Sequence, residues 1–229
     1  MNFSKAKDTY RKNAIVQRLM AKKLISEVTK NYGNSFDNIL EIGTGTGLLT
    51  DEITSKLNIK KLYLNDLTKN FTGTTPCKYY QGDILEILKC GIKEKFNLII
   101  SNAVFQWIDD KEELLLKLKD RLQNKGLIAF SSFGHKNFCQ IKHTAGLALL
   151  KKTGFKILYF EEELETLYFK DMQNLLEHIR LTGVGTSKTL WTKQKYEIFK
   201  EEYLRNFSDE NGVELTYHPV YYICALQHS

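Results

Sequence analysis

The stretch Asn38-Ile-Leu-Glu-Ile-Gly-Thr-Gly-Thr-Gly47 decides the fold of this chain. Its first five residues, Asn38–Ile42, form a short apolar run of the kind found in buried strands, and a helix is predicted from about Leu48. A glycine-rich turn between a strand and a helix lets backbone N–H groups approach a ligand closely, because no Cβ intervenes. The stretch therefore predicts a ligand-binding strand–turn–helix unit.

The spacing of the glycines separates two kinds of ligand site. The dinucleotide fingerprint GxGxxG requires its third glycine at the position that Leu48 occupies. The chain has instead Glu41-Ile-Gly43-Thr-Gly45-Thr-Gly47, the pattern ExGxGxG. This pattern resembles the first motif of the class I methyltransferases, which use S-adenosylmethionine, and it disfavours a nicotinamide-dependent oxidoreductase.

The rest of the chain alternates strand-like and helical patterns. Short apolar runs predict strands at Lys61–Asn65, Lys78–Tyr80, Asn97–Ser101, Leu127–Ser131, Phe155–Phe160 and Tyr221–Leu226. Helical spacing predicts helices at Val16–Val28, after Trp107, and at Phe138–Lys152, Asp171–Leu181 and Thr192–Phe207. The predicted fold class is α/β, a Rossmann-like class I methyltransferase fold with about seven mostly parallel strands and helices on both faces. The resemblance implies that the last strand is antiparallel.

Two helical regions have more specific predictions. In the helix after Trp107, Asp110 and Glu113 form a capping-box pattern, the buried stripe runs on to Leu122, and Gly126 is expected to close the helix. Residues 171–207 are expected to form a helical cover over the carboxyl edge of the sheet. One domain is predicted over 1–229, with an N-terminal helical segment at about 1–34.

Acidic and polar residues follow the predicted strands and, in the family resembled, bind the cofactor. The resemblance implies that Asp66 holds the ribose hydroxyls and that Asp83 takes the adenine amine while Ile84 packs on the ring. The resemblance also implies that Ser101 and Asn102, which end a predicted strand, face the sulfonium of the cofactor. A solvated loop aspartate and a helix N-cap are the structural alternatives for Asp66 and Asp83. All of these positions fall at the carboxyl ends of strands, where open α/β sheets bind ligands.

The segment between Asp66 and Asp83 departs from the family pattern. Only 16 residues, 67–82, separate the two carboxylates, and Gly73 and Pro76 lie among them. The helix usually found there must therefore be short or absent. For the same reason, the sequence does not assign the residues that contact the outer face of the adenine.

Composition limits the location and the partners. The chain begins with no signal-peptide pattern and has no apolar run of about 20 residues, so a cytoplasmic, non-membrane protein is expected. The four cysteines form no CxxC pair, so no metal site is expected. Basic residues crowd the N-terminal segment and suit an acidic partner, whereas no motif supports nucleic acid: Lys5, Lys7, Arg11, Lys12, Arg18, Lys22 and Lys23.

Four pieces of sequence point to one family within the class. They are Phe3 with Tyr10 and Gln17, Ser101-Asn-Ala-Val-Phe-Gln-Trp107, Arg180-Leu-Thr-Gly-Val-Gly185, and Leu215-Thr-Tyr-His218. Together they resemble the malonyl-acyl-carrier-protein O-methyltransferases of biotin synthesis, and the resemblance extends over almost the whole chain. The SNxxxQW segment and the LTYH ending are the most distinctive pieces.

The resemblance implies methylation of the free carboxylate of a malonyl thioester. A carboxylate with a pKa near 4 is already ionised at neutral pH, so no general base is required. We expect Arg180 to hold this carboxylate with its planar fork, and Tyr10 to close the pocket. Gln106, Tyr217 and His218 are expected to form a polar lining, with Trp107 as a wall. The acidic surface of an acyl carrier protein would suit the basic N-terminal segment.

Other interpretations of the same residues stay open. Arg180 could be a surface helix residue, Tyr10 a packing residue, and Tyr217 and His218 partners of the local backbone. A class I methyltransferase acting on a small phenol, quinone precursor or amine needs a general base, for which His218 or His143 could serve. A catalytically idle scaffold is a further alternative, although the intact glycines and acidic residues disfavour it. Carrier protein and coenzyme A thioesters are not distinguished, nor is the oligomeric state.

Overall fold

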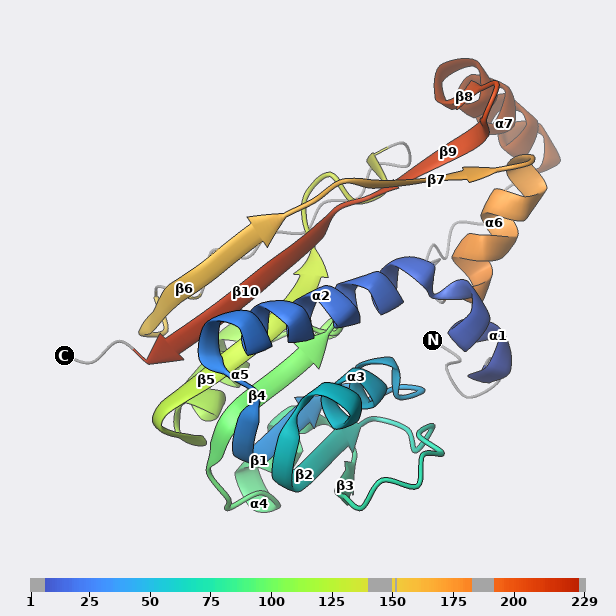
Figure 1. Cartoon of the computed structure of the whole chain (residues 1–229). Helices are drawn as coiled ribbons and strands as arrows, with labels where there is room; N and C mark the ends of the chain where they lie inside the picture. Colours follow the sequence, from blue (N-terminus) through green and yellow to red (C-terminus); the bar gives the residue numbers. More distant parts are fainter. Residues whose placement is uncertain (1–6, 140–149, 151, 183–191, 227–229) are drawn as a thin grey trace.

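The computed structural model describes residues 7–139, 150, 152–182 and 192–226. Its main sheet has seven strands within these residues, in the order β3-β2-β1-β4-β5-β10-β6 (Figure 1). The strands are β1 (Ser35–Ile42), β2 (Asn58–Asp66), β3 (Lys78–Gln81), β4 (Phe96–Asn102), β5 (Leu122–Phe133), β6 (Phe155–Glu162) and β10 (Pro219–Leu226). Strands β1 to β5 pair in parallel, and β10 pairs antiparallel with β5 and β6. The predicted Rossmann-like α/β fold with an antiparallel last strand is confirmed.

Helices cover both faces of this sheet because its strands are apolar on both sides. Helices α2 (Ile15–Tyr32) and α3 (Leu48–Lys56) pack on one face, and α4 (Ile84–Cys90) and α5 (Lys111–Lys119) pack on the other. In β1, Ile39 belongs to the first hydrophobic cluster and Leu40 to the second, as the two-residue period of a strand requires. The described helices include none that is long and apolar enough to cross a membrane.

A second, three-stranded sheet extends from the main one and was not predicted. It has the order β7-β9-β8 and is formed by β7 (Glu165–Phe169), β8 (Ser208–Asp209) and β9 (Gly212–Tyr217). Strands β6 and β7 follow one another along the chain, as do β9 and β10, so the two sheets are joined by a long ribbon (Figure 1). This ribbon carries the helices that follow β7.

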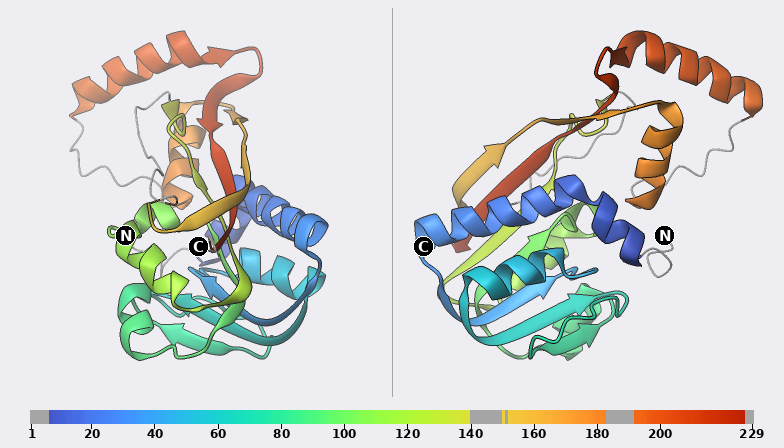
Figure 2. Two further views of the ribbon diagram at one scale, coloured as in Figure 1. Left: turned by 90° about the vertical axis from the view of Figure 1, so that its left-hand side faces the viewer. Right: turned by 45° about the vertical axis from the view of Figure 1, so that its right-hand side comes forward.

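The expected cover over residues 171–207 is divided between two places. The short first helix α1 (Lys7–Asn13) contacts α6 (Met172–Leu181) at the carboxyl edge of the main sheet. Helix α7 (Lys193–Phe207) instead packs on β9, where the Tyr203 hydroxyl donates to the Glu214 carbonyl at 2.7 Å. Both helices end at the predicted residues and start one residue later than predicted, because Asp171 and Thr192 are their N-caps. Helix α7 lies far from the carboxyl edge (Figure 2).

Helix α5 begins where the sequence predicts but ends earlier than predicted. Asp110 caps α5 by accepting from the Glu113 N–H at 2.8 Å, as predicted, but α5 ends at Lys119 and not at Gly126. Strand β5 already begins at Leu122, and Gly126 lies inside it. Residues 67–77, all of which are described, contain no helix, as expected from the short spacing. The predicted helix Phe138–Lys152 falls largely on residues outside the described part, as does the turn at 183–185.

Gly126 is expected to be required for the packing of β5 against β4. A Cβ at this position would lie 2.8 Å from the Phe96 carbonyl oxygen and 3.0 Å from that of Gln123. Gly126→Ala should therefore lower the free energy of unfolding by about 1–3 kcal/mol, the usual cost of overpacking. Urea denaturation measures this loss. Lys125→Gly is the control, because Lys125 is exposed at a φ of 62°, where glycine is tolerated; equal losses in both variants would contradict the steric argument.

Candidate functional site

A cavity of about 910 Å³ lies at the carboxyl ends of the parallel strands. Residues that end or directly follow β1, β2, β3, β4 and β5 contribute to its wall, and α1, α2 and α6 close it from above. Its volume is at the upper end of the range for small-molecule sites, which is roughly 300–1,000 Å³. The cavity therefore has room for more than one small ligand group.

The glycine turn forms the floor of this cavity after β1. Gly43 has a φ of 74°, and a Cβ on it would lie 2.2 Å from the Val104 side chain. Gly47 has a φ of 91° and packs similarly against Phe71. A Cβ on Gly45 would meet nothing within 4 Å, so this residue borders open space. Two glycines thus permit close packing beneath the turn, while Gly45 faces the cavity.

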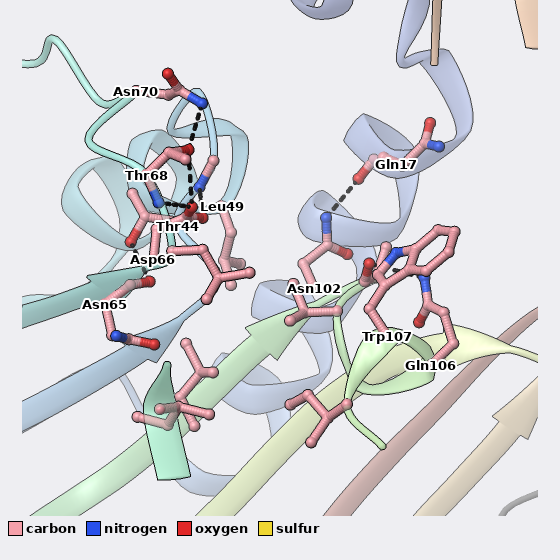
Figure 3. Close-up of a pocket in the computed structure, with 18 of the residues that line it drawn as sticks. Gln17, Thr44, Leu49, Asn65, Asp66, Thr68, Asn70, Asn102, Gln106 and Trp107 are labelled. Atoms are coloured by element: carbon pink, nitrogen blue, oxygen red, sulfur yellow. Dashed lines mark hydrogen bonds between the residues drawn. The ribbon is translucent and has the colours of Figure 1, made fainter. Parts of the chain in front are cut away.

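Asp66 ties the glycine turn to the loop after β2. Its Oδ2 accepts from the Gly45 N–H at 2.8 Å, and its Oδ1 accepts from the Thr68 N–H at 3.0 Å (Figure 3). The neighbouring Asn65 side chain donates to the carbonyls of Tyr80 and Gly82, which fixes the end of β3. Oδ1 also accepts from the Thr68 hydroxyl at 3.3 Å. Asp66 is therefore held in one orientation on the cavity wall, and its Oδ2 retains a lone pair for a ligand.

Asp83 is both a helix N-cap and a cavity-wall residue, the two alternatives that the sequence left open. Its carboxylate caps α4 by accepting from the Leu85 N–H at 2.7 Å. Asp83 and Ile84 also line the cavity, next to the end of β3. Capping engages one carboxylate oxygen, so the other stays available to a ligand.

Glu41, Gly47 and Ser101 lie beneath the cavity and are not part of its wall. The buried Glu41 carboxyl accepts from the Thr50 hydroxyl at 2.7 Å and so joins β1 to α3, while its Oε1 has no partner among the residues that the structure describes. The Ser101 hydroxyl donates to the Ile42 carbonyl at 2.8 Å and joins β4 to β1. Burial raises the pKa of Glu41 to about 8, despite the hydrogen bond from Thr50, which lowers it.

Glu41 is expected to make stability depend on pH. Its pKa is about 8 in the fold and 4.5 for an ordinary glutamate, so the native state binds more protons than the unfolded chain between these values. Stability should therefore fall as pH rises through this window. Glu41→Gln removes the titration, so its unfolding free energy relative to the parent should increase from about pH 5 to about pH 8 in urea denaturation. Glu52→Gln on α3 is the control, and a pH-independent difference for Glu41→Gln would contradict the prediction.

A second group of polar side chains lies on the β4 side of the cavity. Asn102 donates to the Gln17 carbonyl of α2 at 2.9 Å (Figure 3). It also accepts from the Ser131 hydroxyl at 2.6 Å. Gln106 accepts from the Ser132 hydroxyl at 3.0 Å and donates to the Ala103 carbonyl at 2.8 Å. These bonds fix α2 and the turn after β4 against the strand ends.

The N-terminal helices close the cavity over the glycine turn. Arg11 donates to the Thr46 carbonyl at 2.9 Å and pairs with the Asp51 carboxylate of α3. Tyr10 lines the wall, and burial, with a smaller contribution from Asp66, raises its pKa to about 12. Its phenol is thus neutral at physiological pH and can act as a hydrogen-bond donor.

Gln17 is a wall residue to which the sequence analysis gave no site role. It is only 3% exposed, it lines the cavity, and its side-chain oxygen has no partner among the described residues. The available signal was its place beside Phe3 and Tyr10 in the N-terminal piece that resembles the family, because Tyr10 lies on α1 and Gln17 on α2 and no single helical face joins them. Further wall residues without an earlier role include Thr44, Thr46, Leu49, Leu67, Thr68, Asn70 and Ile108.

The residues expected on the acceptor side divide into two groups. Arg180, at the end of α6, lines the wall with Tyr10, Gln106 and Trp107. The side chain of Arg180 is 72% exposed, and its one ion pair within the described residues is with Glu177 at 3.4 Å.

Tyr217 and His218 are buried but are not brought to the cavity wall. The Tyr217 hydroxyl is 2.8 Å from Nε2 of His178 and so joins β9 to α6. His218 accepts from the Lys136 N–H at 3.1 Å through Nδ1, and burial lowers its pKa. His143, the other candidate base, lies outside the described residues.

The charge of the wall favours a cationic ligand. Four carboxylates and one guanidinium line it, from Asp66, Asp83, Asp109, Asp110 and Arg180. Within the described part of the chain, no three His, Cys, Asp or Glu side chains are grouped to hold a metal ion.

Comparison with known proteins defines the class first. Residues 11–215 match the family model described as a methyltransferase domain. A solved structure from Bacillus halodurans C-125, described as a methyltransferase, superposes with a TM-score of 0.63 at 14% identity, covering 91% of this chain and 99% of that one. Fold, glycine turn and family match together define a methyltransferase.

Curated relatives then define the family. The malonyl-(acyl-carrier protein) O-methyltransferase of Calditerrivibrio nitroreducens is 39% identical over 97% of this chain and 94% of its own length. The protein of the same name from Bacteroides thetaiotaomicron is 33% identical over 96% of this chain and 94% of its own length. The chain belongs to the malonyl-(acyl-carrier protein) O-methyltransferase family.

Proposed function

We propose that this protein transfers the methyl group of S-adenosylmethionine to the free carboxylate of malonyl carried on an acyl carrier protein. The product is the malonyl methyl ester, which enters biotin (pimeloyl) synthesis. The observation that carries the proposal is one continuous cavity with the glycine turn and Asp66 on one side and the Arg180 guanidinium on the other. The names of the relatives, which match over nearly their full length, support the same substrate.

The wall residues fit S-adenosylmethionine. Asp66 would accept from a ribose hydroxyl through the remaining lone pair of Oδ2, a second ribose hydroxyl would replace the Thr68 hydroxyl on Oδ1, and Asp83 with Ile84 would hold the adenine. Gly43, Gly45 and Asn102 would border the rest of the cofactor, while Glu41, Gly47 and Ser101 support these residues from below. Gly45 borders open space, and the buried Thr46 hydroxyl has no partner among the described residues, so a polar ligand is accommodated here. When bound, the sulfonium supplies an activated methyl group.

The acceptor side suits a group that needs no deprotonation. The described wall residues include no histidine, lysine or cysteine, and Tyr10 is held neutral by its raised pKa. A malonyl carboxylate is already ionised at neutral pH, whereas a phenol or an ammonium must lose a proton before it attacks. Arg180 would orient the carboxylate by its planar fork, and Tyr10 with Trp107 would exclude water. Gln106, Tyr217 and His218 would support this side, the last two from behind the wall.

We propose one methyltransferase domain over 1–229. Its support is that residues 35–42 and 219–226 lie in the same sheet. A cytoplasmic location is proposed because all four cysteines are free, as is usual in a reducing compartment. The partner proposed for the basic N-terminal segment is the acidic carrier protein, and neither nucleic acid nor membrane is proposed.

One incubation tests the proposal. The protein is mixed with methyl-labelled S-adenosylmethionine and malonyl-carrier protein, malonyl-coenzyme A or the acetyl thioesters, and the products are analysed for a methyl ester. Label should enter the malonyl thioesters alone, because acetyl groups offer no carboxylate. Labelled acetyl thioester, or no labelled malonyl thioester, would refute the proposed acceptor. Transfer of label to a small phenol or amine, added in a parallel incubation in place of the thioesters, would support the alternative methyltransferase.

A further inference from the structure

The basic residues of the N-terminal segment are not equally available to a partner. Arg11 is engaged by Thr46 and Asp51. Lys23 pairs with Glu161 at 2.7 Å and also with Glu163, which joins α2 to the end of β6. These two cations stabilise the fold. The exposed Arg18 guanidinium donates to the Arg11 carbonyl, but among the described residues no carboxylate forms an ion pair with Arg18 or Lys22.

Two exposed apolar residues accompany these unpaired cations. Ile15 is 48% and Leu19 is 46% exposed, whereas the residues between them on the inner side of α2, Val16 and Gln17, are buried. Ile15, Arg18, Leu19 and Lys22 are spaced at i, i+3, i+4 and i+7, so they share one face of the helix, which we name the α2 stripe. This face looks outward from the molecule, because α2 lies on the outside of the sheet (Figure 2).

The α2 stripe and the cavity lie on opposite sides of the same helix. Gln17 lines the cavity, and its carbonyl is bound by Asn102 at the end of β4. A helix with its side chains is about 10 Å across, so a protein docked on the stripe would stand one helix width from the cavity. A flexible prosthetic arm could cross that distance, whereas the body of the partner could not enter the cavity.

We propose that the α2 stripe is the docking face for the acidic protein that carries the malonyl thioester. This inference rests on the proposed function and names the surface that the carrier occupies. Arg18 and Lys22 attract carboxylates of the carrier, and Ile15 and Leu19 pack against an apolar residue between them. Lys23 has no docking role in this proposal, because its charge is already neutralised by Glu161 and Glu163.

The test compares a carrier-bound substrate with a small one. In the double variant Arg18→Glu with Lys22→Glu, KM for malonyl-carrier protein should rise by about tenfold or more, with kcat nearly unchanged. Activity on malonyl-coenzyme A and the affinity for S-adenosylhomocysteine by calorimetry should equal those of the parent. Raising the salt concentration should increase the parent's KM for the carrier protein, because salt screens exposed charges. The difference in KM between the double variant and the parent should therefore become smaller.

Two further variants make the test specific. Lys193→Glu with Lys195→Glu on α7 makes the same change in net charge far from α2 and should leave every constant unchanged (Figure 1). Ile15→Ser with Leu19→Ser should raise KM for the carrier with little dependence on salt. Parental KM in the α2 double variant, or an equal rise in the α7 variant, would overturn the docking face. Failure of the parent to methylate either malonyl thioester would instead refute the proposed function.

Discussion

Asp66→Ala is expected to weaken S-adenosylmethionine binding by roughly 10- to 150-fold, or about 1.5–3 kcal/mol, as hydrogen bonds to a charged group usually contribute. The variant removes the proposed acceptor for the ribose. It also releases the Gly45 and Thr68 N–H groups that the carboxylate holds in place. Calorimetric titration with S-adenosylmethionine measures the loss, and circular dichroism checks that the variant is folded.

The control for this variant is Asp37→Ala, which removes one carboxylate near the opposite end of β1, where Asp37 pairs with Lys60. It should bind the cofactor like the parent. NAD should bind neither protein, because the turn lacks the third glycine of the dinucleotide fingerprint. Unchanged affinity in Asp66→Ala would reject the ribose assignment, and tight binding of NAD would reject the cofactor itself.

Arg180→Ala should lose kcat/KM for malonyl thioesters by roughly 30- to 150-fold, or about 2–3 kcal/mol, while cofactor affinity stays at the parental value. We expect the lower part of the range for a broken charge pair because the Arg180 side chain is 72% exposed in the structure. The substrate must displace Glu177 and cover the guanidinium before the pair gains its full strength. Steady-state kinetics with malonyl-coenzyme A, together with calorimetry, separate the two effects.

Two variants control for a general effect of charge. Arg180→Lys should recover part of the activity, because a point charge reproduces the attraction but not the two parallel hydrogen bonds. Arg205→Ala, an exposed arginine on α7, should be neutral. Parental turnover in Arg180→Ala would assign the carboxylate to another donor, and the buried neutral phenol of Tyr10 would be the next candidate.

The sequence predicted the main sheet because most of its strands contain a short apolar run that is followed by a turn signal. It did not predict where α5 ends. Leu114, Leu118 and Leu122 continue the helical spacing, yet Leu122 is buried as the first residue of β5. A buried strand residue and a buried helix residue have the same apolar character, so periodicity alone could not separate them.

The second sheet was missed for a related reason. Exposed and less exposed residues alternate from Phe155 to Lys170, but only the apolar part up to Phe160 was interpreted as a strand. Strand β7 is polar at Glu165 and Thr166, because the small sheet has little core to cover. This alternation is one of exposure and not of hydrophobicity, since Leu158, Phe160 and Leu164 are among the exposed residues, so the sequence offered no two-residue period here.

Cofactor residues were easier to predict than acceptor residues because a strand end fixes a position in a parallel sheet. Asp66, Asp83 and Asn102 all reach the cavity wall. Tyr217 could not be placed, since its direction depends on His178 of α6, which packs against β9 from a distant part of the sequence. Pairing between elements far apart in the chain decides such side chains, and a single sequence does not record it.

The position of β10 between β5 and β6 has a consequence for the order in which the chain folds. Residues 219–226 insert between β5 and β6, which precede them by some sixty to one hundred residues, so both neighbours keep an unpaired edge until the last strand has been synthesised. During translation the parallel half of the sheet can assemble while β5 still exposes its backbone N–H and C=O groups. An open edge of this kind pairs readily with other chains. Aggregation of nascent or truncated chains is therefore expected to begin at β5, and completion of β10 is the step that closes it.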